Sequence, residues 1–277
     1  MSRRPSRPVR VVASALAAGA LLTTAACSDD GNGSGNGARA SDVSASPLAR
    51  KQPTYSPSPA LTEAGARAAL ITEADIEDDW TQVKDTEAEN WHDGLLVGTV
   101  DVSDFLTAKA DAADCQRLLD SLFDDDLLGR PSGASALRGF EQGDSRLLYQ
   151  VAAYDRTDPQ DSLDWMATLP EKCDQFTATD NGEERTVQVV ETSLPDVGDA
   201  REGLLVTVKG TVDDTPATLT LEVAAVRVGA ADAITVTAGG LDEAEEDSVK
   251  DALENGTQRL KDVQAGKTPA ASPSEIE

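Results

Sequence analysis

Histidine is almost absent from this chain of 277 residues, which has a single one, His92, and aromatic residues make up only 4% of it. A serine hydrolase needs a histidine beside a serine and a carboxylate, and His92 lies in the polar, turn-like stretch Glu89–Gly94, which is more typical of a surface loop. The few aromatic residues leave little to stack on sugar rings. The 50 Asp and Glu residues keep a two-carboxylate glycosidase as an alternative, although no pair of them stands out.

Motifs for phosphate or metal binding are also missing. No G-x-G-x-x-G pattern follows an expected strand, so no nucleotide cofactor is predicted. The best match to a calcium loop places Asp124 and Asp126 at its first and third positions, but Leu128 and Ser135 then stand where oxygen ligands are required. We therefore expect the three aspartates at 124–126 to form a solvated acidic loop, and we predict neither a metal site nor a catalytic residue.

Positive charge is scarce as well. The chain has 24 Lys and Arg residues against 50 Asp and Glu, a formal net charge of −26. Four arginines and no acidic residue precede Cys27, which leaves 20 basic residues against 50 acidic ones from there on, a net charge of −30. So acidic a surface repels nucleic acid and anionic lipid, and neither is expected as a partner. The excess of Arg over Lys is typical of a GC-rich bacterium.

The first 26 residues have the layout of an export signal. Four arginines precede an apolar segment from Val11 to Leu22, whose length of about a dozen residues suits a secretory signal and is too short for a membrane span. An arginine pair near the start suggests twin-arginine export, but the residues that follow it are not the apolar pair that this signal uses. We therefore predict ordinary secretion, with cleavage between Ala26 and Cys27.

Cys27 ends the run Leu21–Cys27, which resembles the lipobox of bacterial lipoproteins. The resemblance implies that Cys27 carries a thioether-linked diacylglycerol and palmitate-type acylation, and that the protein is anchored on the extracytoplasmic face of the cell membrane. Two acyl chains anchor a protein stably where one does not. The alternative is a soluble secreted protein that is cut at the same place, with Cys27 as a spare thiol.

The two remaining cysteines, Cys115 and Cys173, are expected to form one disulfide, because an isolated pair of thiols oxidises outside the cytoplasm. A metal site is the other possibility. It would have only two sulfurs and the distant His92, which is short of the usual four ligands.

Composition divides the chain into four parts. Residues 1–26 are the signal, and residues 27–60 are rich in Gly, Ser, Asn and Pro and are predicted to be a disordered linker with a reach of roughly 30 Å. Residues 61–264 are long enough for one domain with a full core. Residues 265–277 are predicted to be a short disordered tail.

Hydrophobic periodicity within the domain indicates a mixture of helices and strands. A helix near Thr62–Leu70 is followed by Thr72, which is expected to cap the next turn with Asp75. Another helix should bury an apolar face made of Cys115, Leu118, Leu119 and Leu122. In all, helices are expected at 62–70, 108–123, from 158 and at 241–263, and strands at 95–102, 146–154, 186–192, 204–212, 219–228 and 233–238.

Short polar connections between the alternating strands favour an antiparallel meander. A domain with an antiparallel sheet and separate helices belongs to the α+β class, and we expect the helices to pack on one face of this sheet. Trp80, Trp91 and Trp165 are candidates to line a cleft, and packing in the core or between helix and sheet is at least as good an interpretation for Trp80 and Trp165.

The segment Ala69–Ile76, the strand Leu147–Tyr154, the helix leading to Cys173–Phe176 and the strand-rich second half resemble the PknH-type extracellular sensor domain of actinobacterial receptor kinases and lipoproteins. The resemblance covers about Leu61 to Val263. It implies a ligand-binding cleft formed by sheet and helices, with no particular ligand.

The sequence therefore predicts a lipid-anchored, non-enzymatic sensor or binding domain at the cell envelope, whose ligand is a small molecule or a cell-wall component. It gives no ligand-binding residues and no oligomeric state. The alternative is a carrier lipoprotein, which should enclose an apolar cavity of several hundred Å³, whereas a sensor should have a shallower polar cleft.

Overall fold

The structure is a computed structural model, and it describes residues 60–76, 79–89, 96–97, 100–101, 103–180, 182–212, 215–241 and 245–269. All of them belong to one unit of the chain, Tyr55–Glu277. Several predicted features lie outside the described residues. They are the signal peptide, the lipid attachment expected at Cys27, nearly all of the linker, and Trp91 and His92. The predicted domain end at residue 264 coincides with the end of the last helix.

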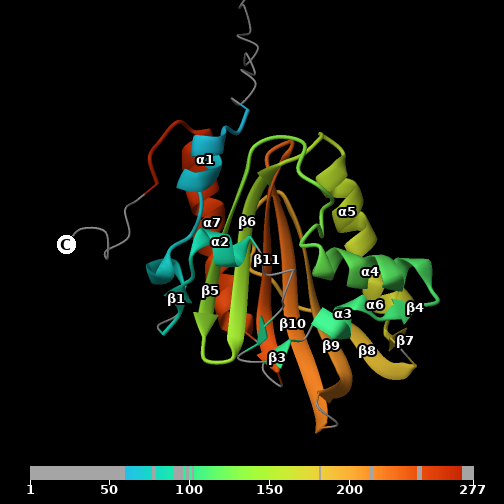
Figure 1. Cartoon of the computed structure of the whole chain (residues 1–277). Helices are drawn as coiled ribbons and strands as arrows, with labels where there is room; N and C mark the ends of the chain where they lie inside the picture. Colours follow the sequence, from blue (N-terminus) through green and yellow to red (C-terminus); the bar gives the residue numbers. More distant parts are fainter. Residues whose placement is uncertain are drawn as a thin grey trace, which may run out of the picture. The chain divides into compact units, whose positions relative to one another are not determined.

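A nine-stranded antiparallel sheet forms the centre of the domain, in the order β1-β5-β6-β11-β10-β9-β8-β7-β4 (Figure 1). The predicted antiparallel α+β class is confirmed, and the four strands from β8 to β11 form the predicted meander, which β7 extends by one strand. The strands are β1 (Thr81–Gln82), β4 (Lys109–Ala110), β5 (Ser135–Gln142), β6 (Ser145–Ala153), β7 (Gln175–Asp180), β8 (Glu183–Glu191), β9 (Ala200–Val212), β10 (Thr215–Val228) and β11 (Asp232–Leu241).

Successive side chains of a strand point to opposite faces of the sheet, and β10 has apolar side chains on both faces. Leu221 pairs with Val206 of β9, and these residues belong to one core cluster, on a side that we call the disulfide face. Val226 pairs with Ile234 of β11, and these residues belong to a second cluster, on the opposite side, which we call the α7 face. Both faces of the sheet therefore need cover.

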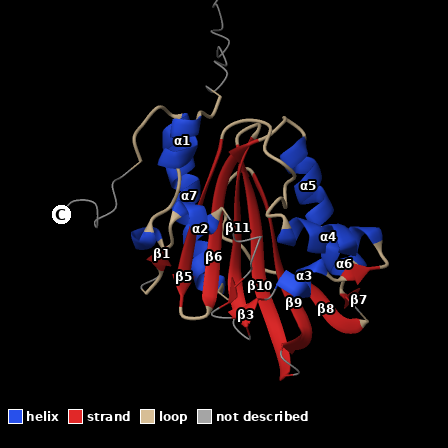
Figure 2. Ribbon diagram, in the orientation of Figure 1, coloured by secondary structure: helices blue, strands red, loops and turns tan. Residues whose placement is uncertain are grey.

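Two groups of helices provide this cover, one at each side of the sheet (Figure 2). One group packs against β5, β6, β10 and β11 on the α7 face, and the other packs against β8, β9 and β10 on the disulfide face. The first group is α1 (Glu63–Ala68), the 3-10 turn η1 (Glu73–Asp75) and α7 (Glu246–Gln264); the second is α3 (Ser103–Thr107), α4 (Ala113–Phe123), α5 (Asp158–Met166) and α6 (Leu169–Lys172). A further short helix, α2 (Asp85–Ala88), contacts β5.

The expectation that helices pack on one face only is thus wrong. It followed from the general layout of α+β domains, in which helices cover one face of an antiparallel sheet. In β10 the alternation holds only as far as Val223, and the run Val223–Val226 is apolar at every position. A strand with two apolar faces is stable only between two layers.

Several elements differ from the predicted ones. The strand predicted at 95–102 is instead a hairpin of β2 (Leu96–Val97) and β3 (Val100–Asp101), and a glycine in the middle of the run weakens a continuous strand. Strands β5 and β7 were not predicted. The glycines at 239 and 240 do not end β11, because both pair with β10.

The predicted disulfide between Cys115 and Cys173 is present, with a Cα–Cα distance of 5.6 Å. Cys115 lies on the apolar face of α4 beside Leu118, Leu119 and Leu122, all buried as expected. The bond joins α4 to the end of α6 on the disulfide face. On the chain-entropy model, closing a loop with a sequence separation of 58 residues stabilises the fold by about 4 kcal/mol.

Helix α7 approaches the sheet closely at Gly256, which stands over the fully buried ring of Tyr149 on β6. A Cβ atom at Gly256 would overlap the Tyr149 hydroxyl and lie only 2.7 Å from the ring atom Cζ. Tyr149 lies in the middle of β6, and its ring cannot move aside without displacing other residues of the second core cluster. Glycine therefore sets the distance between α7 and the sheet.

We expect Gly256→Ala to lower the free energy of unfolding by about 1–3 kcal/mol, the usual cost of overpacking a core. Helix propensity alone would give the opposite sign, because alanine favours a helix over glycine by about 1 kcal/mol. Gln258→Ala, at an exposed position of the same helix, is the matched control and should change little. Urea denaturation measures both. A Gly256→Ala protein as stable as the parent would show that the helix can move away from Tyr149.

Candidate functional site

Trp80 and Trp165, the two tryptophans that the structure describes, pack in the core, which is one of the two roles that the sequence left open. Trp80 is buried in the second core cluster, and its indole Nε1 donates a hydrogen bond of 3.0 Å to the Ser248 hydroxyl of α7. Trp165 is buried in the first cluster, with the Arg117 guanidinium carbon 3.8 Å from its ring centroid. Neither ring is available to bind a ligand.

The acidic loop at 124–126 is not solvated throughout. Asp124 is exposed, as expected, but Asp125 and Asp126 are half-buried, and burial raises the pKa of both carboxyls. Within the described part of the chain, no three His, Cys, Asp or Glu side chains are close enough together to hold a metal ion.

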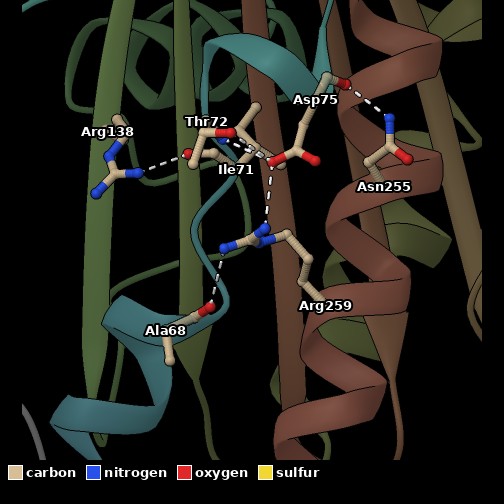
Figure 3. A network of polar contacts seen from close by, with 7 residues as sticks. All are labelled: Ala68, Ile71, Thr72, Asp75, Arg138, Asn255 and Arg259. Atoms are coloured by element: carbon tan, nitrogen blue, oxygen red, sulfur yellow. Dashed lines mark hydrogen bonds and ion pairs between the residues drawn. The ribbon is translucent and has the colours of Figure 1, made fainter. Parts of the chain in front are cut away.

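The segment Ala69–Ile76, which carries part of the family resemblance, fastens the start of the domain to α7 (Figure 3). The Asp75 carboxylate accepts hydrogen bonds from the Thr72 backbone N–H (2.8 Å) and hydroxyl (3.0 Å), which is the predicted cap. The same carboxylate pairs with Arg259 at 3.3 Å. The Asn255 side chain donates to the Asp75 carbonyl oxygen at 2.7 Å.

A second arginine holds this segment from the sheet side. Arg138 of β5 donates a hydrogen bond of 2.8 Å to the Ile71 carbonyl oxygen, and Arg259 reaches the Ala68 carbonyl oxygen at 3.5 Å (Figure 3). Both arginines thus bond to backbone oxygens that the short α1 and the turn after it leave without helical partners. These contacts give the residues of this segment a structural role, which is to fasten the start of the domain to β5 and α7.

The best candidate for a ligand site is an open cleft where β8 ends and β9 begins, which we call the β8–β9 cleft. Its volume is about 500 Å³. Carboxylates, hydroxyls and one guanidinium dominate the wall, and apolar side chains are few. The lining residues are Glu191, Thr192, Ser193, Leu194, Ala200, Arg201, Glu202 and Gly203.

One wall of the cleft is held rigidly against the sheet. The Thr192 backbone N–H donates to the Gly203 carbonyl oxygen at 3.0 Å, and the Thr192 hydroxyl donates to the buried carboxylate of Glu222 at 3.1 Å. A Cβ atom at Gly203 would lie 2.7 Å from the Thr192 methyl group and 2.8 Å from Leu194. Glycine at 203 therefore lets the segment after β8 pack flat on β9 and shape the cleft.

Negative charge is concentrated at the cleft. The pKa of Glu202 is raised, first by its partial burial and then by the neighbouring carboxylates Glu191 and Asp164, while Arg201 opposes the shift. Arg201 itself forms an ion pair of 2.8 Å with the exposed Asp196. The cleft thus suits a polar ligand that donates hydrogen bonds or carries positive charge, since such a ligand would relieve the repulsion among these carboxylates.

Sequence reasoning did not find this cleft. Its residues come from two strand ends and the segment between them, and none belongs to a recognisable motif. A possible signal is the long connection between the two strands, which contains Pro195 and Gly198, because functional residues are often located on such loops.

In comparisons with known proteins, no protein-family model, no curated protein and no solved structure matches this chain. Among the helices that the structure describes, none has both the length and the hydropathy of a membrane span.

We expect Glu202→Gln to raise the melting temperature at pH 7. A carboxyl whose pKa is raised in the folded state stabilises the fold below its unfolded pKa, and this stabilisation is lost as the pH rises. The variant should therefore gain most at neutral pH, and the gain should vanish as the pH falls below the usual glutamate pKa of 4.5.

Thermal unfolding between pH 4 and pH 8 measures the effect. Glu184→Gln, which removes the same charge from an exposed position on β8, is the matched control and should show no such gain. A Glu202→Gln protein that melts below the parent at pH 7 would mean that the charged carboxylate makes a stabilising contact.

Proposed function

We propose that this protein is a ligand-binding or sensor domain that a lipid on Cys27 holds at the outer face of the cell membrane. The observation that carries the proposal is the β8–β9 cleft, which is open, polar and large enough for a small molecule or for part of a cell-wall polymer. Its polar walls favour a binding domain over a carrier of apolar molecules.

The disulfide supports an address outside the cytoplasm, because such bonds persist mainly in oxidising compartments. The layout of the first 27 residues, with a basic segment, an apolar segment and small residues before cysteine, supports export and lipidation. Together they favour an anchored envelope protein over a cytoplasmic one.

The position of the cleft in the domain agrees with this arrangement. Helix α1 begins beside the C-terminal part of α7, where Gly65 approaches Val263 (Figure 1). Gln264, the last residue of α7, donates a hydrogen bond of 3.1 Å to the Val228 carbonyl oxygen at the end of β10. The adjoining part of β10 pairs with the first residues of β9, which line the cleft. The cleft therefore lies at the end of the sheet where the linker joins the domain.

Binding without chemical conversion is the simplest use of this cleft. The only histidine, His92, lies outside the described residues, and the two cysteines of the domain are joined to each other. Catalysis in the cleft would have to depend on its carboxylates, and we propose that these bind the ligand instead.

Lipid attachment is tested by Cys27→Ala in a bacterium that processes lipoproteins. The parent should sediment with the membranes, and the variant should be released into the soluble fraction, because the domain would lose both acyl chains. Immunoblots of the fractions give the result. A variant that stays with the membranes to the same extent as the parent would contradict the anchor.

Ligand binding in the cleft is tested by native mass spectrometry of the protein released from membranes with detergent. The parent should carry an additional small-molecule mass, and Ser193→Trp, which fills the cleft from an exposed lining position, should lose it. Ser132→Trp places the same bulk at an exposed position outside the cleft and should keep the ligand.

Two results would contradict this assignment. If the parent protein carries no additional mass, the proposal of a resident ligand is wrong. An acyl lipid retained equally by both tryptophan variants would place the ligand elsewhere and favour the carrier alternative.

A further inference from the structure

Asp125, in the turn after α4, has three unusual properties, and it is not among the residues that line the β8–β9 cleft. Its backbone has a φ of +52°, in the left-handed region that residues other than glycine rarely adopt. Asp and Asn tolerate this region better than most residues, yet such a conformation persists only where its surroundings hold it. The other two properties are the anchors on either side of the residue and the cavity that it faces.

The turn is fixed to the domain on both sides of Asp125. Before it, the Asp124 backbone N–H donates to the Asp120 carbonyl oxygen of α4 at 2.9 Å. The Asp126 backbone N–H donates to the Ser121 carbonyl oxygen at 3.1 Å, and the Gly129 N–H donates to the Asp126 carbonyl oxygen at 2.6 Å. Leu127 and Leu128 are inserted into the first core cluster and are only 4% and 1% exposed. These two leucines close the turn over the sheet.

The Asp125 side chain lines a small cavity of about 10 Å³ between this turn and the sheet, enough for about one water molecule. The other walls are uncharged. They are Ser121 of α4, Leu127 of the turn, Leu148 and Gln150 of β6, and Thr235 and Thr237 of β11.

The charged groups around this cavity offer Asp125 no compensation. From its own turn it faces Asp124 and Asp126, which are both acidic. The nearest cations, Arg117 on α4 and Arg130 after the turn, act on Asp126, as does the carboxylate of Asp120.

The sheet supplies no cation either, within the residues that the structure describes. The wall residues from β11 are threonines, and β6 contributes Gln150. The Tyr154 hydroxyl, just after β6, donates to the Gln150 side-chain oxygen at 3.4 Å. Burial and the two neighbouring carboxylates accordingly raise the pKa of Asp125 to about 7.

We propose that the turn Asp124–Gly129 is a pH-operated latch, which lies closed on the sheet while the Asp125 carboxyl is protonated and opens when that carboxyl ionises in the cavity. Opening would withdraw Leu127 and Leu128 and uncover Gln150, Thr235 and Thr237. The latch goes beyond the proposed ligand binding in the β8–β9 cleft and does not depend on it.

The latch would also enlarge an existing pocket. A second open pocket, of about 440 Å³, lies on the outer side of the same turn and shares Ser121 with the cavity. Its wall includes Gln116, Arg117, Asp120, Asp124 and Asp126. With the turn open, the pocket and the cavity would merge, so the pH would set the depth of this second pocket.

The direction of the effect follows from linkage. A carboxyl with a raised pKa in the closed state favours closure at low pH, and this preference is lost as the pH rises from the usual aspartate value of 3.8 to about 7. An acidic exterior keeps the latch closed, and a neutral to alkaline one opens it.

Hydrogen exchange of the intact chain tests this proposal. After correction for intrinsic rates, the backbone amide of Asp126, which the closed turn holds on the Ser121 carbonyl oxygen, should lose protection in the parent by on the order of tenfold or more between pH 5.5 and pH 8. Asp125→Asn should show the same protection at both pH values. Asp124→Asn, which changes an exposed neighbour, should keep the parent's pH dependence.

Equal protection of the parent at both pH values would overturn the latch, and so would a pH dependence that survives in Asp125→Asn. Should Asp125→Asn fail to fold, a pH titration of protection in the parent alone decides. A protection that falls steadily as the pH rises to about 7 and then levels off supports the latch, and a protection that stays constant from pH 5.5 to pH 8 overturns it.

Discussion

Burial of β10 on both of its faces is the constraint on which the rest of this domain depends. Leu221 and Val223 face the disulfide-bonded helices, whereas Val226 and Val228 face α7. A strand of this kind needs a neighbour on each edge and a layer on each side, which the chain supplies from two different regions. Helices α3 to α6, from the middle of the chain, cover one face, and the C-terminal helix α7 packs on the other. The β8–β9 cleft forms at an end of this arrangement, where the connection between β8 and β9 crosses the sheet.

Excess negative charge shapes the sites that this architecture leaves at the surface. Most of the 50 carboxylates can remain in water, where their repulsion is screened. The fold partly buries a few of these carboxylates. Burial is the first cause of the raised pKa of Asp125, Glu202 and Asp232. Asp232 is offset by a hydrogen bond of 2.9 Å from Gln264, which is structural. Among the residues that the structure describes, Asp125 and Glu202 have no comparable partner; they lie at a cavity and at a cleft, where a proton or a ligand can act on them.

Local patterns predicted the parts of the fold that depend on neighbouring residues. The apolar stripe of α4, the Thr72–Asp75 cap and the alternation of β9 can all be read within about ten residues, and the structure has all three. Strand β5 was missed because Arg138 interrupts its pattern. That arginine is tolerated because it bonds to the Ile71 carbonyl oxygen, 67 residues away in the sequence, which no local pattern can indicate.

The sequence by itself determined the antiparallel α+β class and the pairing of Cys115 with Cys173, because periodicity and a count of two thiols suffice for these. Only the tertiary structure decided that helices cover both faces, that a cleft brings Glu191 and Glu202 together, and that Asp125 faces a cavity. The reason is that the environment of a side chain depends on segments that are distant in sequence. Burial and neighbouring charge, which set the chemistry of a carboxylate, are properties of the fold rather than of the residue.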